Sequence, residues 1–343
     1  MNITAPDKGD KTDIKVNRPG ILITAISLIL LTLGLYFSYK NHTAKPFLHE
    51  AHFTKFFMDT YIEINVLDKD EKKAEKAAEE AFAVFAELDK KYNYYDKNSY
   101  LSRINNNEIK EIDDPETAFL IKKGIEFSEK SNGAFDMTLG AVKDLYPFGK
   151  KDPIPPERKK IEEALAVSGY KKVRFEGNKL TKPESLKLDP GGILKGYAVD
   201  KAIELLRKNG IENALVNAGG NIGVLGSNPK GKPWKIGVEN PRTQGEVIAV
   251  ISLVNKAVAT SGDYQRYFFY NGKRYHHILD PSTGEPADKT YGATVTAPDA
   301  ITTDAYSTAV FVMGKKKGME FLKKEKLEGI IIDKDGTESN ISN

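Results

Sequence analysis

The segment "NALVNAGGNIGVLG", residues 213–226, decides the fold class of this chain. Its glycines are similar to those of a dinucleotide-binding loop, which requires a helix directly after the glycines. Here the chain continues with "SNPKGKPW" and then with another strand-like run, so the requirement is not met. The segment is therefore predicted to be a glycine-rich strand and turn that can still pass close to a flat ligand.

The elements around this segment predict an α+β fold with largely antiparallel sheets and packed helices. Apolar residues at helical spacing and helix-end signals predict helices over 71–92, 114–131, 157–168, 193–208, 303–313 and 316–326. Strand-like runs lie at 60–67, 171–181, 185–189, 213–226, 234–240, 247–262, 265–280, 292–298 and 328–336. Strands and helices occur in clusters rather than in regular βαβ alternation, and Asn271-Gly272 is predicted to be a hairpin turn.

The composition excludes several classes of protein. A chain of 343 residues with 40% hydrophobic content can bury one large core or two modest ones. The net charge of +3 is small and dispersed, so no nucleic-acid partner is expected, since proteins that follow a phosphate backbone concentrate basic residues on one face. Cysteine is absent, which excludes disulfides, thiolate metal sites, thiol nucleophiles and an acylated N-terminal Cys.

An uncharged apolar run, "ILITAISLILLTLGLYFSY" at residues 21–39, is about long enough to cross a bilayer as a helix. A cleaved signal peptide is the alternative, but the following "KNHTAKP" matches a cleavage site poorly. More basic residues precede the run than follow it closely, which places the N-terminus in the cytoplasm. We therefore expect a cytoplasmic tail (1–20), a single-pass anchor in the cell membrane, a linker (40–50) and a folded extracytoplasmic domain (51–343).

The segment "LDPGGILKGYAVDKAIELL", residues 188–206, places Asp189 at a strand end, two glycines in a turn and Lys195 at the start of a helix. The glycines let the backbone approach a ligand, the helix N-terminus offers N–H groups to an anion, and Lys195 supplies a positive charge for a phosphate. An ordinary strand–turn–helix with a solvated lysine fits the same residues equally well. The segment is not a Walker loop.

The segment "ITTDAYSTAV", residues 301–310, places Asp304 four residues before Thr308 at the expected start of an apolar helix. Oxygen ligands one turn apart on the same helical face suit a hard divalent cation such as Mg²⁺. Capping of the helix by Thr303 and Asp304 is the alternative, and it is favoured by the local chemistry alone. The possible phosphate-binding turn at residues 188–206 favours the metal interpretation, because Mg²⁺ is often bound together with phosphates.

Two adjacent histidines, His276 and His277, precede Asp280 in a predicted hairpin. Neighbouring residues of a strand point to opposite faces, so only one of the two histidines can face a given site. A lone strand histidine is more often structural than catalytic. The chain has no H-E-x-x-H spacing and no G-x-S-x-G elbow, which disfavours a zinc enzyme and a serine hydrolase.

Several motifs, in matching order, resemble those of the FAD:protein FMN transferases, the ApbE family. They are "MDTYIEI" (58–64), "GAFDMTLGAV" (133–142), "LDPGGILKGYAVDKA", "NAGGNI", "SGDYQRYF", "HHILDPSTGEPA" and "TDAYSTAVFVMG", and together they cover about residues 53–333. The resemblance implies a flavin transferase domain with an ApbE-like fold. Such an enzyme uses Mg²⁺ to split the pyrophosphate of FAD, joins the FMN half through a phosphoester to a Thr or Ser hydroxyl of an acceptor protein, and releases AMP.

Matched residue by residue, the resemblance implies a metal site, a flavin site and catalytic groups. Asp304 and Thr308 correspond to side-chain Mg²⁺ ligands, and the backbone carbonyl of Gly192 corresponds to a third ligand. The flavin and its phosphates are expected around Met58, Tyr95, Ala134, Phe135, Asp136, Asp189 and Lys195, with His277 or Ile278 near the nucleotide. Lys195 and Mg²⁺ would neutralise charge at the anhydride, and His277 is the expected base, with Asp304 or Asp263 as alternatives.

The chain departs from the family pattern at three places. It has no N-terminal Cys, Asp59 stands where a Gly often separates Met from Thr, and "YGATVT" (291–296) is similar to the acceptor motif of family substrates. That position is a plain strand in family members, so self-flavinylation at Thr296 is a minor hypothesis.

The resemblance implies extracytoplasmic acceptor flavoproteins with an S/D-G-A/S-T-x-T type motif as partners. Two other functions fit part of the pattern: an FAD pyrophosphatase that yields FMN and AMP, and a non-catalytic extracytoplasmic flavin-binding protein. Asp304 and Thr308 count against the binding protein, because the capture of FAD requires no metal at the anhydride.

Overall fold

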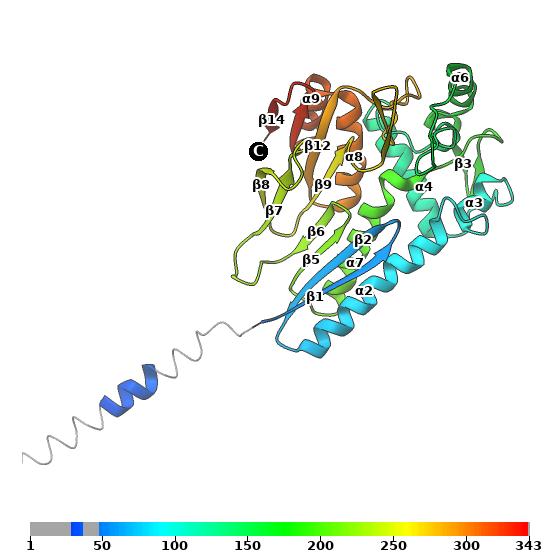
Figure 1. Ribbon diagram of the computed structural model, residues 1–343. Coiled ribbons are helices and arrows are strands. Elements are labelled where there is room, and N and C mark those ends of the chain that lie inside the picture. The colour runs from blue at the N-terminus through cyan, green and yellow to red at the C-terminus, as the bar shows by residue number, and fades with distance from the viewer. Residues whose placement is uncertain (1–28, 37–47, 342–343) are drawn as a thin grey trace, which may run out of the picture. The chain divides into compact units, whose positions relative to one another are not determined.

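The computed structural model describes residues 29–36 and 48–341 (Figure 1). Residues 29–36 are helical, whereas the rest of the predicted anchor, the predicted tail and nearly all of the predicted linker lie outside the described residues. No helix within the described ranges has both the length and the apolar character that a membrane span requires. One compact unit begins at Leu48, and it contains all the elements discussed below.

An eight-stranded sheet, antiparallel at every pairing, forms the centre of this unit (Figure 1). The predicted α+β class with antiparallel sheets is thereby confirmed. In spatial order the strands are β1 (His49–Phe57), β2 (Thr60–Asp68), β5 (Asn213–Ala218), β6 (Asn221–Leu225), β9 (Ala257–Gly262), β12 (Thr290–Ala297), β13 (Glu328–Asp333) and β14 (Glu338–Ile341).

A row of helices covers one face of the sheet (Figure 1). The row consists of α2 (Glu71–Tyr92), α7 (Leu194–Lys208), α8 (Ala300–Met313) and α9 (Lys315–Glu325). Side chains alternate between the two faces of β2, so Ile62, Ile64 and Val66 all face the helices and are fully buried. The apolar stripe of α2 that the sequence predicts is buried as well. The opposite face carries a hairpin of β7 (Trp234–Glu239) and β8 (Val247–Leu253), which packs Trp234 and Leu253 on the sheet.

The smaller elements lie in the chain between α2 and α7. They are α3 (Tyr100–Asn105), α4 (Pro115–Lys130), α5 (Gly140–Lys143), α6 (Arg158–Val167), the 3₁₀ turns η1 (Tyr170–Lys172) and η2 (Pro190–Gly192), and the hairpin of β3 (Arg174–Glu176) and β4 (Lys179–Thr181). The predicted strand at 185–189 is wrong: these residues form only an isolated bridge between Leu139 and Lys187. They pair with no second long segment, so apolar alternation alone does not make a strand there.

The glycine-rich segment that excluded a dinucleotide fold is a tight hairpin. Gly219 and Gly220 form a two-residue turn between paired Ala218 and Asn221, and both glycines have positive φ, 57° and 91°. A Cβ on Gly219 would also lie 2.4 Å from Oγ1 of Thr60. The turn therefore needs glycine, and it fixes the position at which Asn221 starts β6.

A second predicted turn is also present. Asn271 and Gly272, with φ of 48° and 76°, join β10 (Tyr267–Tyr270) to β11 (Lys273–His276). The hairpin predicted from the Asn-Gly pair is confirmed.

The predicted start of the helix at 303–313 is wrong, because α8 begins three residues earlier. Asp299 is the N-cap, and its carboxylate accepts a hydrogen bond from the backbone N–H of Thr302. Asp200 of α7 accepts from the N–H groups of Ala300 and Ile301. The free N–H groups of the first turn are thus already paired, so the capping interpretation of Asp304 fails and its carboxylate is available inside the protein.

Candidate functional site

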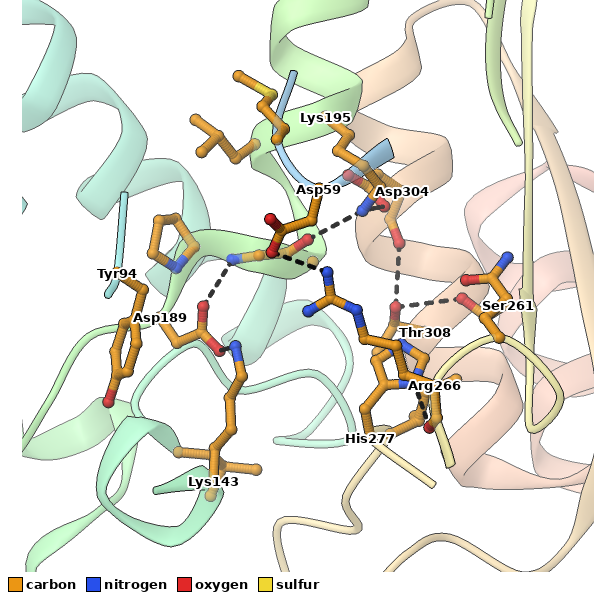
Figure 2. A pocket seen from close by; sticks show the side chains of 18 of the residues that line it. Asp59, Tyr94, Lys143, Asp189, Lys195, Ser261, Arg266, His277, Asp304 and Thr308 are labelled. Carbon is orange, nitrogen blue, oxygen red and sulfur yellow. Dashed lines mark hydrogen bonds and ion pairs between the residues drawn. The ribbon is translucent and has the colours of Figure 1, made fainter. Parts of the chain in front are cut away.

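A cavity of about 570 Å³ lies where the β1–β2 turn, η2, the start of α7 and α8 meet (Figure 2). Residues more than 200 positions apart in the sequence meet in it. Twelve of the residues that the sequence predicts for the flavin, the metal and catalysis line this one cavity, and only the alternative base Asp263 does not: Met58, Tyr95, Ala134, Phe135, Asp136, Asp189, Gly192, Lys195, His277, Ile278, Asp304 and Thr308. Its volume is within the range of small-molecule sites.

Asp189 lies partly buried in the cavity wall, with its side chain 16% exposed, and holds the turn before α7. Its carboxylate accepts from the N–H of Gly191 at 3.0 Å and forms an ion pair with Lys143 at 2.5 Å. Burial alone would raise the pKa of Asp189, but Lys143, Gly191 and Lys195 together hold that pKa below its ordinary value. The Asp189 carboxylate is therefore an anion that orders the backbone of the turn.

Lys195, in the first turn of α7, faces the site rather than bulk water. Its Nζ donates to the carbonyl of Gly191 at 3.2 Å and lies 4.0 Å from Oδ1 of Asp304. Its side chain is about one quarter exposed, at 27%. Of the two interpretations that the sequence left open, a lysine aimed at a bound anion is the one that this geometry favours.

Asp304, in the second turn of α8, is 5% exposed and is held from two sides. Its Oδ2 accepts from the backbone N–H of Gly196 at 3.0 Å, and the side-chain amide of Asn221 favours its ionised form. Burial raises the pKa of Asp304, whereas Lys195, Gly196 and Asn221 oppose that rise. An added cation would relieve the desolvation of this carboxylate.

Two hydroxyl groups of the cavity wall lie near Asp304. Thr308, one turn further along α8, donates to the carbonyl of Asp304, and its Oγ1 lies 3.2 Å from the hydroxyl of Ser261 on β9 (Figure 2). Gly192 is in η2, where a Cβ would lie 2.9 Å from the ring of Phe135. Carboxylate, hydroxyl and carbonyl oxygens are the ligands of hard cations such as Mg²⁺.

A softer or more acidic metal site is not formed by the residues that the structure describes. Among them, no three or more His, Cys, Asp or Glu side chains are grouped so that they could hold a metal ion. A cation in this cavity would therefore depend on hydroxyl and backbone oxygens in addition to Asp304.

The two adjacent histidines point in opposite directions, as strand alternation requires. His276 is 3% exposed, its Nε2 lies 2.9 Å from the carbonyl of Ala287, and its ring packs edge-on against Phe311. His277 lines the cavity, and its Nδ1 lies 3.4 Å from the carbonyl of Arg266. If Nδ1 donates to this carbonyl, Nε2 is left as a proton acceptor. His276 is structural, and His277 is the histidine that can act on a ligand.

Desolvation dominates the titration of His277. Burial lowers its pKa to about 3, and the positive charges of Lys195 and Arg266, together with His276, add to the effect. The imidazole is therefore neutral at physiological pH.

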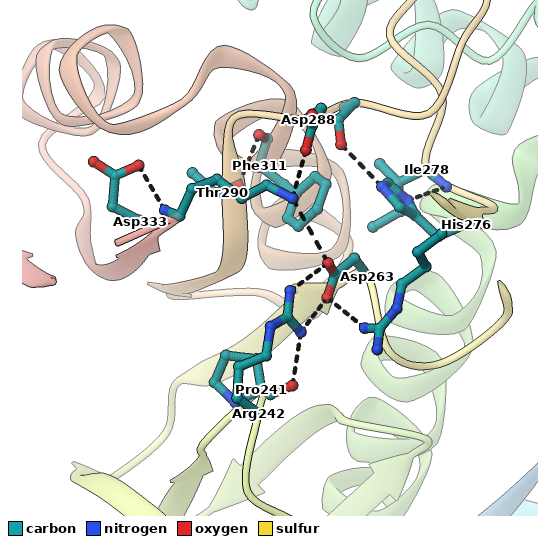
Figure 3. Close-up of polar contacts among 12 residues, drawn as sticks. Pro241, Arg242, Asp263, His276, Ile278, Asp288, Thr290, Phe311 and Asp333 are labelled. Carbon is teal, nitrogen blue, oxygen red and sulfur yellow. Dashed lines mark hydrogen bonds and ion pairs between the residues drawn. The ribbon is translucent and has the colours of Figure 1, made fainter. Parts of the chain in front are cut away.

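Asp263 does not line the cavity, which removes it as an alternative base. Its carboxylate is buried and accepts from Arg242 at 2.9 and 2.6 Å, while Arg274 and Lys334 lie 3.4 and 3.9 Å away (Figure 3). Arg242 also stacks on Tyr291. Asp263 therefore links segments from four strands through ion pairs. Its oxygen atoms face these cations and not a ligand in the cavity, so Asp263 is not placed to accept the hydroxyl proton.

Further polar residues that the sequence did not single out as ligand contacts line the cavity, among them Asn221, Lys143, Ser261 and Arg266. Asn221 is 5% exposed, and its Oδ1 is the one buried side-chain polar atom of the described residues without a hydrogen-bond partner. An unpaired buried oxygen costs about 1–3 kcal/mol, so it indicates an acceptor kept for a ligand. Only the motif "NAGGN" pointed to this residue, and it predicts a turn rather than a ligand contact.

Comparison with known proteins assigns the chain to a family. A sequence model of the ApbE family matches residues 58–331. The chain belongs to the ApbE family. The resemblance seen in the motifs is thereby confirmed.

Named members of the ApbE family are similar over most of their length. A protein of Haemophilus influenzae named FAD:protein FMN transferase is 36% identical over 274 residues, which cover 76% of this chain and 79% of the relative. A Vibrio cholerae protein with the same name is 34% identical over 256 residues, which cover 72% of this chain and 76% of the relative.

Solved ApbE structures have the same fold. The crystal structure of the ApbE protein from Thermotoga maritima superposes with a TM-score of 0.80 at 37% identity and covers 85% of this chain and 97% of its own. The flavin transferase ApbE from Vibrio cholerae gives a TM-score of 0.77 at 30% identity and covers 86% of this chain and 98% of its own.

The pairing of Asp189 with Lys143 generates a testable prediction on stability. Replacement of Lys143 by Met leaves a buried carboxylate without its main partner, which should lower the free energy of unfolding by about 3 kcal/mol at pH 7. In the wild type the lowered pKa of Asp189 contributes stability that is present above the pKa of the unfolded chain and is lost as pH falls, and the loss of Lys143 should raise this pKa and reduce that contribution. The deficit relative to the wild type should therefore be smaller at pH 4 than at pH 7.

Urea denaturation at the two pH values measures the effect. The double variant Lys143→Met, Asp189→Asn is the control, and it should recover most of the loss. If Lys143→Met lost the same free energy of unfolding at pH 4 and at pH 7, the result would contradict the ion pair between Lys143 and Asp189.

Proposed function

We propose that this chain is a Mg²⁺-dependent FAD:protein FMN transferase, which moves FMN from FAD to a Thr or Ser hydroxyl of an acceptor protein and releases AMP. The family and the names of the relatives support transfer of a flavin. One observation supports the proposed chemistry. Lys195, Asp304 and His277 come from three distant segments of the chain and line the same cavity, whose volume suits a small molecule.

The described oxygens fit a hard divalent cation. Asp304, Thr308 and the carbonyl of Gly192 would hold Mg²⁺, with Asn221 fixing the carboxylate from behind. When bound, Mg²⁺ would withdraw electron density from the phosphate oxygens and neutralise charge that develops on the leaving AMP.

The chain's own cations would bind and orient the pyrophosphate. Lys195 lies beside Asp304 at the N-terminus of α7, which has no side-chain cap from Ile193 and where the helix dipole favours an anion. Arg266 and Lys143 line the same cavity and add positive charge. Catalysis of phosphoryl transfer depends mainly on such positioning and charge neutralisation.

The transfer step requires one proton acceptor. The acceptor hydroxyl oxygen forms a bond to the flavin-side phosphorus, the bridging P–O bond breaks, and AMP leaves with that oxygen. The hydroxyl proton passes to Nε2 of His277, whose Nδ1 is engaged by the carbonyl of Arg266. The pKa of His277, about 3 in the protein alone, would rise when the phosphates of FAD place negative charge beside the ring.

We also propose that residues 21–39 anchor the chain in the cell membrane and that the transferase acts outside the cytoplasm. This proposal rests on the apolar run and the basic residues before it. Acceptors would then be extracytoplasmic flavoproteins.

The reaction itself gives the second prediction. Incubation of the protein with FAD, Mg²⁺ and a small acceptor domain that carries a Ser-Gly-Ala-Thr-Ser-Thr stretch should add one FMN, less water, to the acceptor in an intact-mass spectrum. The increment should need Mg²⁺, and Asp304→Asn should reduce its rate by at least about 100-fold, because a neutral amide binds a hard cation poorly. Free FMN and AMP without labelled acceptor would instead indicate a pyrophosphatase, and unchanged bound FAD would indicate a binding protein.

The third prediction concerns His277. Substitution His277→Ala should lower kcat for transfer by about 10²- to 10⁴-fold through loss of the base. Because the pKa of His277 in the free enzyme is about 3, kcat/KM for FAD should not decline through a histidine titration as the pH falls from 8 to 5. Substitution His52→Ala on β1, outside the cavity, is the matched control, and a full transfer rate in His277→Ala would show that the base is another group.

The fourth prediction concerns Asn221. Substitution Asn221→Leu preserves volume but removes the amide that holds Asp304, so Mg²⁺ affinity should fall by about 10- to 100-fold. Calorimetric titration of Mg²⁺ in the presence of FAD measures this affinity. Thr260→Val is the control, since Thr260 lines the cavity but bonds to Thr294, and equal affinity in both variants would remove the role of Asn221.

A further inference from the structure

Two exposed aromatic side chains lie on the β1–β2 hairpin, whose turn lines the cavity. Phe56 and Tyr61 face each other across the two strands, with ring centroids 5.4 Å apart, and are 60% and 66% exposed. The next residue, Phe57, points the other way and packs against the core, so alternation leaves Phe56 and Tyr61 without a packing role.

A second exposed pair lies on β10. Tyr267 and Phe269 have ring centroids 5.5 Å apart and are 43% and 57% exposed. The guanidinium of Arg274 on β11 lies 4.4 and 5.3 Å from the two ring centroids and orders them. Phe268, between them, is buried in a separate apolar cluster, so the two outward rings are again not needed for the core.

An ion pair at the edge of the cavity connects these two hairpins. Asp59, in the turn between β1 and β2, accepts from Arg266 at 2.9 Å, and Arg266 directly precedes β10 (Figure 2). Both residues line the cavity, and their side chains are 63% and 44% exposed, so they lie at its opening. The two aromatic pairs thus lie on the two hairpins that this ion pair joins at the opening, and we name Phe56, Tyr61, Tyr267 and Phe269 the aromatic rim.

We infer that the aromatic rim is the docking surface for the acceptor protein, an inference that rests on the proposed transferase function. The acceptor hydroxyl must reach the phosphorus beside His277, so the segment that carries it must enter at the opening where Asp59 and Arg266 lie. Aromatic side chains with an exposed apolar face are the typical anchors of such interfaces. An uncharged acceptor segment with small and β-branched side chains fits rings that present no unpaired charge.

Two double variants test this surface on the full-length protein: Tyr267→Ser with Phe269→Ser, and Phe56→Ser with Tyr61→Ser. The matched control is Val247→Ser with Val250→Ser, two exposed apolar residues of β8, a strand that contributes no residue to the cavity wall. The probe is the folded acceptor domain carrying the Ser-Gly-Ala-Thr-Ser-Thr stretch, with FAD affinity measured in parallel by flavin fluorescence.

Each rim variant should raise KM for the acceptor by about tenfold, with kcat at saturating acceptor and the affinity for FAD unchanged. The unchanged FAD affinity also shows that the variants are folded. The control variant should behave as the wild type.

Three outcomes would overturn the inference. An acceptor KM equal to that of the wild type in both rim variants removes the docking role. A loss of FAD affinity assigns the rings to the flavin site instead, and a dimer in light scattering that dissociates in the rim variants assigns them to self-association. If the wild type itself transfers no FMN to the acceptor, the proposed function fails, which is distinct from transfer that continues with unaltered KM.

Discussion

The contact between the start of α7 and the start of α8 is the constraint on which the candidate site depends. Gly196 lies so close to α8 that a Cβ would approach the carbonyl of Ala300 to 2.2 Å, and this approach lets its N–H donate to Asp304. Asn221 holds the same carboxylate from β6. A larger residue at position 196 would separate the two helices, and the acidic group would lose the geometry that a metal ligand requires.

Electrostatic pairing prepares the cavity for a charged ligand. Each of the three Lys and Arg side chains that line it lies beside a carboxylate: Lys143 with Asp189, Lys195 with Asp304, and Arg266 with Asp59. A pyrophosphate and a divalent cation bring opposite charges, so they can enter together without leaving a large net charge buried. The exposed Asp59–Arg266 pair is the weakest of the three, because solvent screens it, and it is the pair at the opening.

Local patterns predicted elements well where a single physical rule applied. The apolar stripe of residues 71–92, the Asn271-Gly272 turn and the glycine hairpin at 219–220 are all present, because helical spacing and positive φ are properties of a few neighbouring residues. The strand at 185–189 and the start of α8 were mispredicted for the same reason. An apolar run forms a strand only if a second segment pairs with it, and residues 185–189 have only an isolated bridge. The N-cap of α8 is Asp299 and not Thr303, because the helix already begins at Ala300.

The sequence by itself determined the family, the antiparallel α+β class and twelve residues that line one cavity. Motifs and backbone preferences involve residues that are close together in the chain, so they can be recognised without the tertiary structure. Only the tertiary structure decided that His277 rather than His276 faces the cavity, that Asp263 is tied up by three cations, and that Lys143, Arg266 and Asn221 join the site. These side chains meet across long stretches of sequence, and the contacts that select them arise from sheet pairing and helix packing, which no short motif encodes.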